Sequence, residues 1–256
     1  MKKILLMAMV AFAFMACNGN GADAPSKDQK AIDAATVQAP SLIGQAPEAV
    51  DKALVKAGFT QADVEFAKVA KRHLPARAPQ MQNAEEPVEV VYLYNITEDI
   101  MENEDQSKSI AYVNSVLAKG DCIVIAMAMY LEDKLAGIAC DVMVPMKDSC
   151  SLIYTTVSDG LFKQMPKIDN VYATWQGQVG KEMYTDHAAF VAALAAAKAV
   201  EANEMGSYME KGYGYYGHWD YPDEAEIAAR QAKNEGIFAD CSMFVIDLAH
   251  MDLMGF

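Results

Sequence analysis

Cysteine and histidine are the side chains in this sequence best suited to nucleophilic or metal chemistry. Beyond the N-terminal segment they are Cys122, Cys140, Cys150 and Cys241, with His73, His187, His218 and His250. A cysteine nucleophile needs a histidine base and an orienting group beside it, and no local signature of a cysteine hydrolase surrounds these cysteines. The sequence has no CxxC pair and no closely spaced cysteine and histidine, which disfavours zinc. The GxSxG, P-loop and HExxH patterns do not occur either, so no motif indicates a reaction.

Two acidic clusters could bind a cation, but each has a simpler explanation. Residues 98 to 105 include five acids in eight positions, without the glycine and alternating spacing of a calcium loop. His218 and Asp220 precede Asp223 and Glu224, and acids at this point suit the N-terminus of a helix. We therefore predict neither a metal site nor a cofactor.

The segment Gly212-Tyr213-Gly214-Tyr215-Tyr216-Gly217 matches the dinucleotide-binding pattern GxGxxG by its letters alone. That motif requires a strand before it and a helix after it. A polar segment precedes it here, and bulky tyrosines would crowd a pyrophosphate. We therefore exclude a dinucleotide site.

The same segment is nevertheless the most unusual part of the chain, because six aromatic residues occur between positions 208 and 221. Tyrosine and tryptophan combine a wide flat face with a polar tip, which suits stacking on a sugar ring or contact with a protein. The alternative is a loop whose aromatic rings fold back onto the core. The candidate binding residues are Tyr213, Tyr215, Tyr216, His218 and Trp219.

The composition bounds the class of protein. Of the 256 residues, 53% are hydrophobic and 22% are charged, which excludes a disordered chain and suits one or two domains. The formal net charge is −14, and such an acidic protein is not expected to bind nucleic acid, which requires a basic face.

The N-terminal segment has the pattern of an export signal. Lys2 and Lys3 precede an uncharged apolar run, Ile4 to Ala16, that is too short to span a bilayer. The stretch Phe14-Met15-Ala16-Cys17 that ends it resembles the lipobox of bacterial lipoproteins. The resemblance implies removal of residues 1–16, acylation of Cys17, and a membrane-anchored protein of the cell envelope, at the outer membrane or its periplasmic side.

Membrane attachment would then depend on the acyl chains, because anionic lipid repels an acidic surface. An oxidising envelope also favours disulfides, and we predict at least one among the four later cysteines. Four cysteines allow three pairings, and the sequence leaves all three open. A hairpin turning at Asp133-Lys134 would pair residues whose numbers sum to about 267, which argues against a Cys122–Cys140 bridge.

The chain divides by composition into five parts. They are a signal peptide (1–16), a lipidated flexible tether (17–40), a helical hairpin (41–75), a proline-containing linker (76–87) and an α+β body (88–256). The hairpin is expected to hold helices at 47–57 and 60–74. Residues 27–37 could form a frayed helix without a cap.

In the body, the spacing of apolar residues predicts a mostly antiparallel sheet with helices packed on one face. Strands are expected at 88–95, 122–131, 135–144, 151–157 and 171–178, with the second one central. Helices are expected at 106–119, closed by Gly120, from Thr185 to about Glu204, and at 222–234. Residues 241–249 fit either a strand or a helix.

These observations favour a lipid-anchored envelope protein that acts as a non-enzymatic binding or structural module. Its partner would be an envelope protein or a glycan. The alternative is an exported hydrolase whose site is assembled from distant residues, around His218 or His187. A concave pocket with a perturbed acid–base pair would favour the enzyme, and an exposed aromatic patch would favour the binding module.

Overall fold

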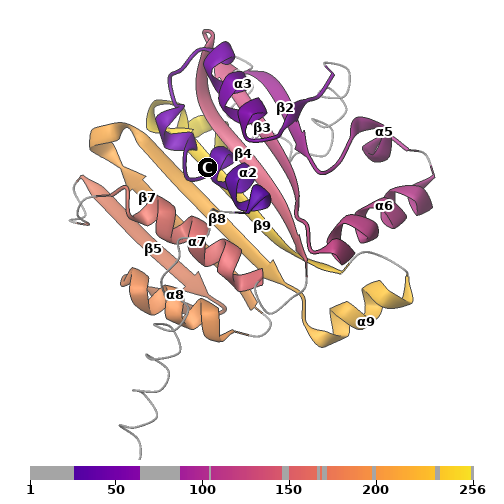
Figure 1. The fold of residues 1–256 in the computed structure, drawn as a ribbon. Helices are drawn as coiled ribbons and strands as arrows, with labels where there is room; N and C mark the ends of the chain where they lie inside the picture. The colour runs from indigo at the N-terminus through magenta and orange to yellow at the C-terminus, as the bar shows by residue number, and fades with distance from the viewer. Residues whose placement is uncertain are drawn as a thin grey trace, which may run out of the picture.

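The computed structural model describes residues 26–63, 87–103, 105–145, 150–165, 168, 172–197, 200–233 and 237–254. Within these ranges nine strands form one open antiparallel sheet in the order β1-β2-β3-β4-β9-β8-β7-β5-β6 (Figure 1). The predicted α+β class with a mostly antiparallel sheet is confirmed. The strands are β1 (Thr60–Gln61), β2 (Val88–Tyr94), β3 (Ile123–Leu131), β4 (Lys134–Pro145), β5 (Ala173–Val179), β6 (Glu182–Tyr184), β7 (Val200–Tyr208), β8 (Tyr213–Tyr221) and β9 (Phe238–Asp247).

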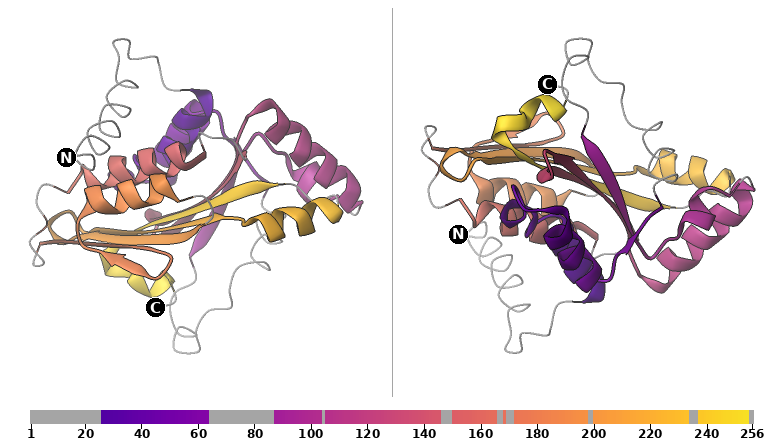
Figure 2. Two further views of the ribbon diagram at one scale, coloured as in Figure 1. Left: turned by 90° about the horizontal axis from the view of Figure 1, so that it is seen from below. Right: turned by 90° about the horizontal axis from the view of Figure 1, so that it is seen from above.

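One face of this sheet, called the inner face here, carries most of the helices and the main core. Helices α2 (Lys27–Ala35), α3 (Pro47–Lys56), α7 (Cys150–Phe162) and α8 (His187–Ala196) supply buried side chains to one cluster with the strands. Figure 2 shows α7 and α8 on this side and the C-terminal 3-10 segment η5 (Leu248–Met254) on the other. The sheet therefore has one face that is extensively covered by helices.

The opposite, outer face has its own helix near β2 and β3. Helix α6 (Gln106–Lys119) packs Val116 against Val91, Leu93 and Ile123 in a second, smaller core. Asp105 caps its N-terminus, and Gly120 ends it with φ +89°, in the left-handed region that glycine adopts without penalty. The predicted helix 106–119 with its glycine stop is confirmed. The short helix α5 (Glu98–Met101) precedes it.

The N-terminal helix α2 corrects the predicted tether. Ser26 caps the helix by accepting a hydrogen bond from the Gln29 backbone at 3.1 Å, and Ala31 and Ile32 are fully buried. From Ser26 onward, therefore, the segment predicted to be a flexible tether belongs to the core. The sequence prediction missed the cap, and it missed the small apolar face of alanines that packs on the sheet. Residues 17–25 lie outside the described part of the chain.

The predicted helical hairpin is only half right. Helix α3 begins at Pro47 and ends near Gly58 as expected, but residues 60 and 61 form the edge strand β1 rather than a second helix. Strand β1 pairs with β2 at Thr60–Leu93 and Gln61–Tyr92. The rest of the predicted second helix, and the linker to residue 86, lie outside the described residues.

The β3–β4 hairpin was predicted closely. Its pairs from Ile123–Met143 to Met129–Gly137 sum to 266, and a register shift follows between Met129 and Tyr130. The turn residues Glu132 and Asp133 have φ +49° and +58°, as a two-residue type I′ turn requires. Strand β3 is central and buried on both faces, because Val124 lies in the inner core and Ile123 in the outer one.

Two predictions in the second half of the body are wrong. The sequence predicts a strand at residues 151–157, but they belong to helix α7 although β-branched residues, which favour strands, are frequent there. Tyr154, Val157 and Leu161 recur at helical spacing and are fully buried, so tertiary packing outweighs local propensity.

The predicted alanine-rich helix is also too long. Asp186, not Thr185, caps α8 through the Ala189 backbone at 2.8 Å, and the helix ends at Ala196. Residues 200–208 form β7, where Ala202, Glu204, Gly206 and Tyr208 alternate as buried residues. Its glutamates, alanine and methionine favour helices in isolation, whereas the period of two in burial shows the strand.

The aromatic segment is a strand rather than a loop. A single turn, η4 (Met209–Lys211), and Gly212 at φ +71° reverse the chain between β7 and β8. Helix α9 (Glu224–Ala232) connects β8 to β9. Strand β9 continues to Asp247, so residues 241–249, which fit either a strand or a helix by their sequence, are mainly strand. The described helices include none long and apolar enough to span a membrane.

Candidate functional site

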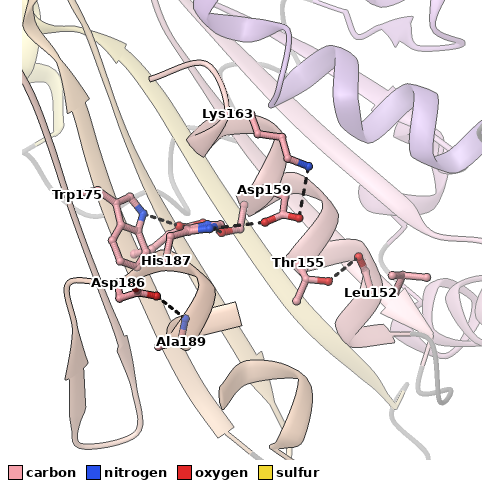
Figure 3. A network of polar contacts seen from close by, with 10 residues as sticks. Leu152, Thr155, Asp159, Lys163, Trp175, Asp186, His187 and Ala189 are labelled. Carbon is pink, nitrogen blue, oxygen red and sulfur yellow. Dashed lines mark hydrogen bonds and ion pairs between the residues drawn. The ribbon is translucent and has the colours of Figure 1, made fainter. Parts of the chain in front are cut away.

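A buried polar cluster lies between α7, α8 and the inner face of β5 and β7. Ser158 comes from α7, His187 begins α8, Trp175 lies on β5 and Glu204 on β7. Figure 3 shows His187 between Trp175 and Asp159, with Lys163 beyond Asp159. We call Ser158, His187, Glu204, Trp175 and Asp159 the Glu204 cluster.

Local sequence rules place each of these side chains. Ser158 lies four residues after Tyr154 on the buried face of α7, and Asp159 follows it on the edge of that face. Glu204 occupies an inward position in the alternating pattern of β7. The Asp186 cap fixes the first turn of α8, and hence His187.

The contacts form a chain of polar atoms. Ser158 Oγ lies 2.9 Å from His187 Nε2 and 2.9 Å from Glu204 Oε2. Trp175 Nε1 donates to the same Glu204 oxygen at 3.0 Å. His187 Nδ1 lies 3.6 Å from Asp159 Oδ1, on the side of the ring away from Ser158. Glu204 Oε1 is buried and has no hydrogen-bond partner among the described residues.

The cluster is shielded from water at one end and open at the other. Ser158 is 0% exposed and Glu204 is 1% exposed, whereas the Asp159 side chain is 42% exposed. The Phe162 ring stacks on the face of His187 at 4.0 Å between centroids, and Trp175 lies against the imidazole in a T-shaped contact at 5.0 Å, next to Phe162. Aromatic rings therefore enclose the imidazole.

Burial shifts the two titrating groups in opposite directions. Desolvation raises the pKa of the Glu204 carboxyl to about 7, although the hydrogen bonds from Trp175 and Ser158 counteract it. Desolvation also lowers the pKa of His187, and the neighbouring Asp159 carboxylate partly opposes that change. Both shifts favour the uncharged form of each group.

The order serine, histidine, aspartate is the arrangement used to activate a serine nucleophile. Two features limit that chemistry here: the Ser158 hydroxyl is sealed from solvent, and it also contacts a carboxyl group. A substrate would reach Ser158 only if α7 or α8 moved. As it stands, the cluster can hold and transfer a proton, and it joins the two helices to the sheet.

The predicted aromatic binding residues are split between the two faces of β8. Tyr213, Tyr215 and Trp219 are buried on the inner face, and Trp219 packs against Tyr154 at 5.3 Å between ring centroids. An exposed array of all five residues is therefore wrong, because adjacent side chains on a strand point to opposite faces. Only Tyr216 and His218 lie on the outer face, where both are partly exposed, and their binding role stays a prediction.

The cysteines and acids give no further site in the described part of the chain. Cys140 and Cys241 are buried free thiols on the neighbouring strands β4 and β9, so neither forms the predicted disulfide. Burial raises the pKa of both thiols, which makes them poor nucleophiles. Among the described residues, no three histidine, cysteine or acidic side chains converge to hold a metal ion.

Sequence reasoning identified one member of the Glu204 cluster. His187 was named as a possible centre of a hydrolase site, whereas Ser158 and Glu204 were not singled out. Glu204 had been assigned to a helix end, and Ser158 lies just beyond a segment predicted as a strand. The signal in the sequence is that Glu204 is the single acid among alternate residues that are otherwise small or aromatic, Ala202, Gly206 and Tyr208.

A scan against models of known protein families finds no match, and searches of curated proteins and of solved structures find none either.

Proposed function

We propose that this chain is a lipid-anchored protein of the bacterial cell envelope that acts as a non-enzymatic binding or structural module. Acylated Cys17 holds it at the membrane, and the outer face of the sheet contacts an envelope protein or a glycan. The anchor is inferred from the lipobox-like residues Phe14 to Cys17. The main support for the binding face is the register of the strands β4, β9, β8 and β7.

That register aligns outer-face side chains in rows across the sheet. One row is largely apolar and joins Met205, Tyr216 and Phe244. The next row is polar and joins Asn203, His218 and Ser242. Met205 is 44% exposed, and the other members are partly exposed.

An apolar row beside a polar row suits a partner that offers a flat face and hydrogen-bonding groups. Strand β4 extends the polar row with Asp141, which accepts a hydrogen bond from Ser242 at 2.6 Å. A third row joins Glu201, Asp220 and Asp240, so one end of the surface is acidic. The reactive groups of the Glu204 cluster lie on the other face, away from this surface.

The binding test compares two double variants of the outer face in full-length protein. Tyr216→Ala with His218→Ala removes the centre of the two rows, whereas Thr174→Ala with Ser207→Ala removes a hydroxyl pair on β5 and β7 of the same face. Chemical crosslinking in membranes and binding to immobilised envelope glycans measure the two partner classes. We expect the first variant alone to lose its partner. Equal retention by both variants would contradict a binding role for Tyr216 and His218.

The anchoring test uses Cys17→Ala, with Asn18→Ala as the matched control. Only Cys17→Ala should abolish incorporation of a palmitate analogue and release the protein from membranes, because one thioether carries the acyl chains. If Cys17→Ala lacks lipid yet stays on membranes after a high-salt wash, the anchoring proposal fails.

A second candidate function is an exported hydrolase with Ser158 as nucleophile, His187 as base and Asp159 as orienting group. The 2.9 Å contact between Ser158 Oγ and His187 Nε2 favours it. A fluorophosphonate probe tests this candidate in the native protein. The binding proposal expects no labelling at Ser158, whereas labelling that disappears in Ser158→Ala would favour the hydrolase.

A further inference from the structure

The Glu204 cluster connects a buried carboxyl group to the protein surface through three successive contacts. Glu204 Oε2 contacts Ser158 Oγ at 2.9 Å, and Ser158 Oγ contacts His187 Nε2 at 2.9 Å. The other nitrogen of His187 faces Asp159 at 3.6 Å, where the chain of contacts reaches solvent. Each member can give or take a proton, so two hydrogen bonds and the longer 3.6 Å approach to Asp159 line up as a path to the surface.

The hydroxyl of Ser158 determines which proton arrangements are possible, because it has one proton and two neighbours. If Ser158 donates to His187 Nε2, then Glu204 must be protonated and donate to Ser158, and His187 carries its proton on Nδ1, facing Asp159. If Ser158 donates to Glu204 instead, His187 Nε2 must donate to Ser158. Nδ1 then either turns a lone pair toward the Asp159 carboxylate at 3.6 Å, in the neutral Nε2–H form, or is protonated as well, in the imidazolium.

The surroundings favour the first arrangement at mildly acidic pH. The groups that face the cluster are Tyr154 and Asp159 from α7, Asp186 from α8, Trp175 from β5, Tyr215 from β8 and Cys241 from β9, with Lys163 of α7 at the rim. Lys163 pairs with Asp159 at 3.6 Å rather than with Glu204. None of the other groups in this set carries a permanent positive charge that could stabilise an ionised Glu204 carboxylate.

When Glu204 loses its proton, it can no longer donate a hydrogen bond to Ser158 as it does in this arrangement. Passage of that proton through Ser158 and His187 leaves Ser158 donating to the Glu204 carboxylate and His187 in the neutral Nε2–H form, with the Nδ1 lone pair facing the Asp159 carboxylate. The carboxylate is then buried without a cation, and only an imidazolium at His187 or access to water compensates its charge. Desolvation disfavours the imidazolium, as the lowered pKa of His187 indicates. Access to water requires separation of α7 and α8 from β5 and β7, because Ser158 and His187 belong to these helices.

We propose that Glu204, Ser158, His187 and Asp159 form a proton relay, and that loss of the relay proton to water through Asp159 at alkaline pH loosens α7 and α8 from the sheet. The relay is a conformational device that responds to pH. It is independent of acylation at Cys17 and of binding at the outer face.

The first test is the tautomer of His187, read from the imidazole nitrogen shifts of the ¹⁵N-labelled full-length protein. At about pH 6 we expect the neutral Nδ1–H form, which accepts from Ser158. A neutral Nε2–H form or an imidazolium would overturn the proposal. This measurement uses the wild-type protein, so it does not depend on the folding of any variant.

The second test is hydrogen exchange from about pH 6 to about pH 9, corrected for the intrinsic pH dependence of exchange, with α6 as the internal reference. We expect exchange in α7 and α8 to accelerate about tenfold relative to α6 in the wild type. Glu204→Gln should abolish this acceleration, whereas Asp240→Asn, which removes a titrating acid on the outer face, should retain it. Equal acceleration in Glu204→Gln and wild type would overturn the relay.

Discussion

The inner and outer faces of strands β7 and β8 carry similar residue types in opposite environments. Trp219 and Glu204 point inward and are each 1% exposed, whereas Tyr216 and His218 point outward and are partly exposed. A carboxyl on each face has a raised pKa, about 7 for Glu204 and about 6 for Asp240 on the neighbouring strand β9, and burial is the main cause of both. The difference lies in the partners: Arg230 counteracts the shift at Asp240, whereas hydrogen bonds from Trp175 and Ser158 counteract it at Glu204.

This comparison teaches that an aromatic, glycine-rich segment can serve two purposes in alternate residues. The inward aromatic residues build the core, and inward glycines on β7 and β8 leave room for large rings. The Tyr215 ring contacts the backbone position of Gly206, and Tyr154 Oη lies 3.0 Å from the position of a Cβ at Gly217. The outward residues are then free of that packing constraint and can serve recognition.

The largest expected effect separates the faces through adjacent residues of β8. Trp219→Ala should reduce the free energy of unfolding by about 3–5 kcal/mol, because it leaves a cavity in the inner core. His218→Ala should change it by less than about 0.5 kcal/mol. Urea denaturation of the two variants measures both values, and similar losses would contradict the assignment of faces.

The next effect concerns Glu204 and the pH dependence of stability. Its pKa of about 7 in the folded protein lies above the value of 4.5 that is ordinary for a glutamate side chain. The stability that depends on its proton is therefore complete below about pH 4.5 and is lost as the pH rises through about 7. At about 1.4 kcal/mol per pKa unit, the loss is about 3 kcal/mol. Denaturation across this range should show a smaller loss in Glu204→Gln than in wild type.

His187 contributes to the pH dependence of stability with the opposite sign. Burial lowers its pKa, so its stabilising contribution is present above the ordinary histidine value of 6.5 and is lost as the pH falls. Subtracting the Glu204→Gln curve from the wild-type curve leaves the contribution of Glu204 together with its coupling to His187 through Ser158. A difference curve that rises with pH would contradict the sign assigned to Glu204.

A smaller effect is expected at two glycines on opposite faces. Gly206→Ala should cost about 1–3 kcal/mol, because the new methyl group would overlap the Tyr215 ring. Gly214→Ala on the outer face meets the flexible side chain of Leu248 at 3.1 Å and should cost less. Thermal unfolding of the pair provides the comparison, and a larger loss in Gly214→Ala would refute the packing argument.

The smallest effect on stability is expected from Tyr216→Ala, at less than about 0.5 kcal/mol. Its expected effect is on partner capture rather than on folding, since the side chain lies on the outer face. Calorimetry and membrane crosslinking of the same preparation measure the two quantities. A melting temperature of Tyr216→Ala far below that of the wild type would show that Tyr216 belongs to the core.

The sequence predicted those elements whose signals are local. Gly120 ends a helix through its own backbone conformation, and the polar Glu132-Asp133 pair separates two apolar strands. Sequence-based prediction failed for elements whose structure depends on tertiary packing. Helix α2 is ordered by a buried face of alanines, and α7 is helical despite its β-branched residues. The Glu204 cluster depended on both failed assignments of α7 and β7, so its geometry was beyond sequence reasoning.

The most direct test of the two-face account is hydroxyl-radical footprinting of the native full-length protein. Tyr215 and Tyr216 are neighbours in sequence with similar intrinsic reactivity, and so they serve as a matched pair. The account predicts oxidation of Tyr216 and His218, with Tyr215 and Trp219 protected until the protein unfolds. Oxidation of Tyr215 and Trp219 at the rate of Tyr216 in the native protein would contradict it.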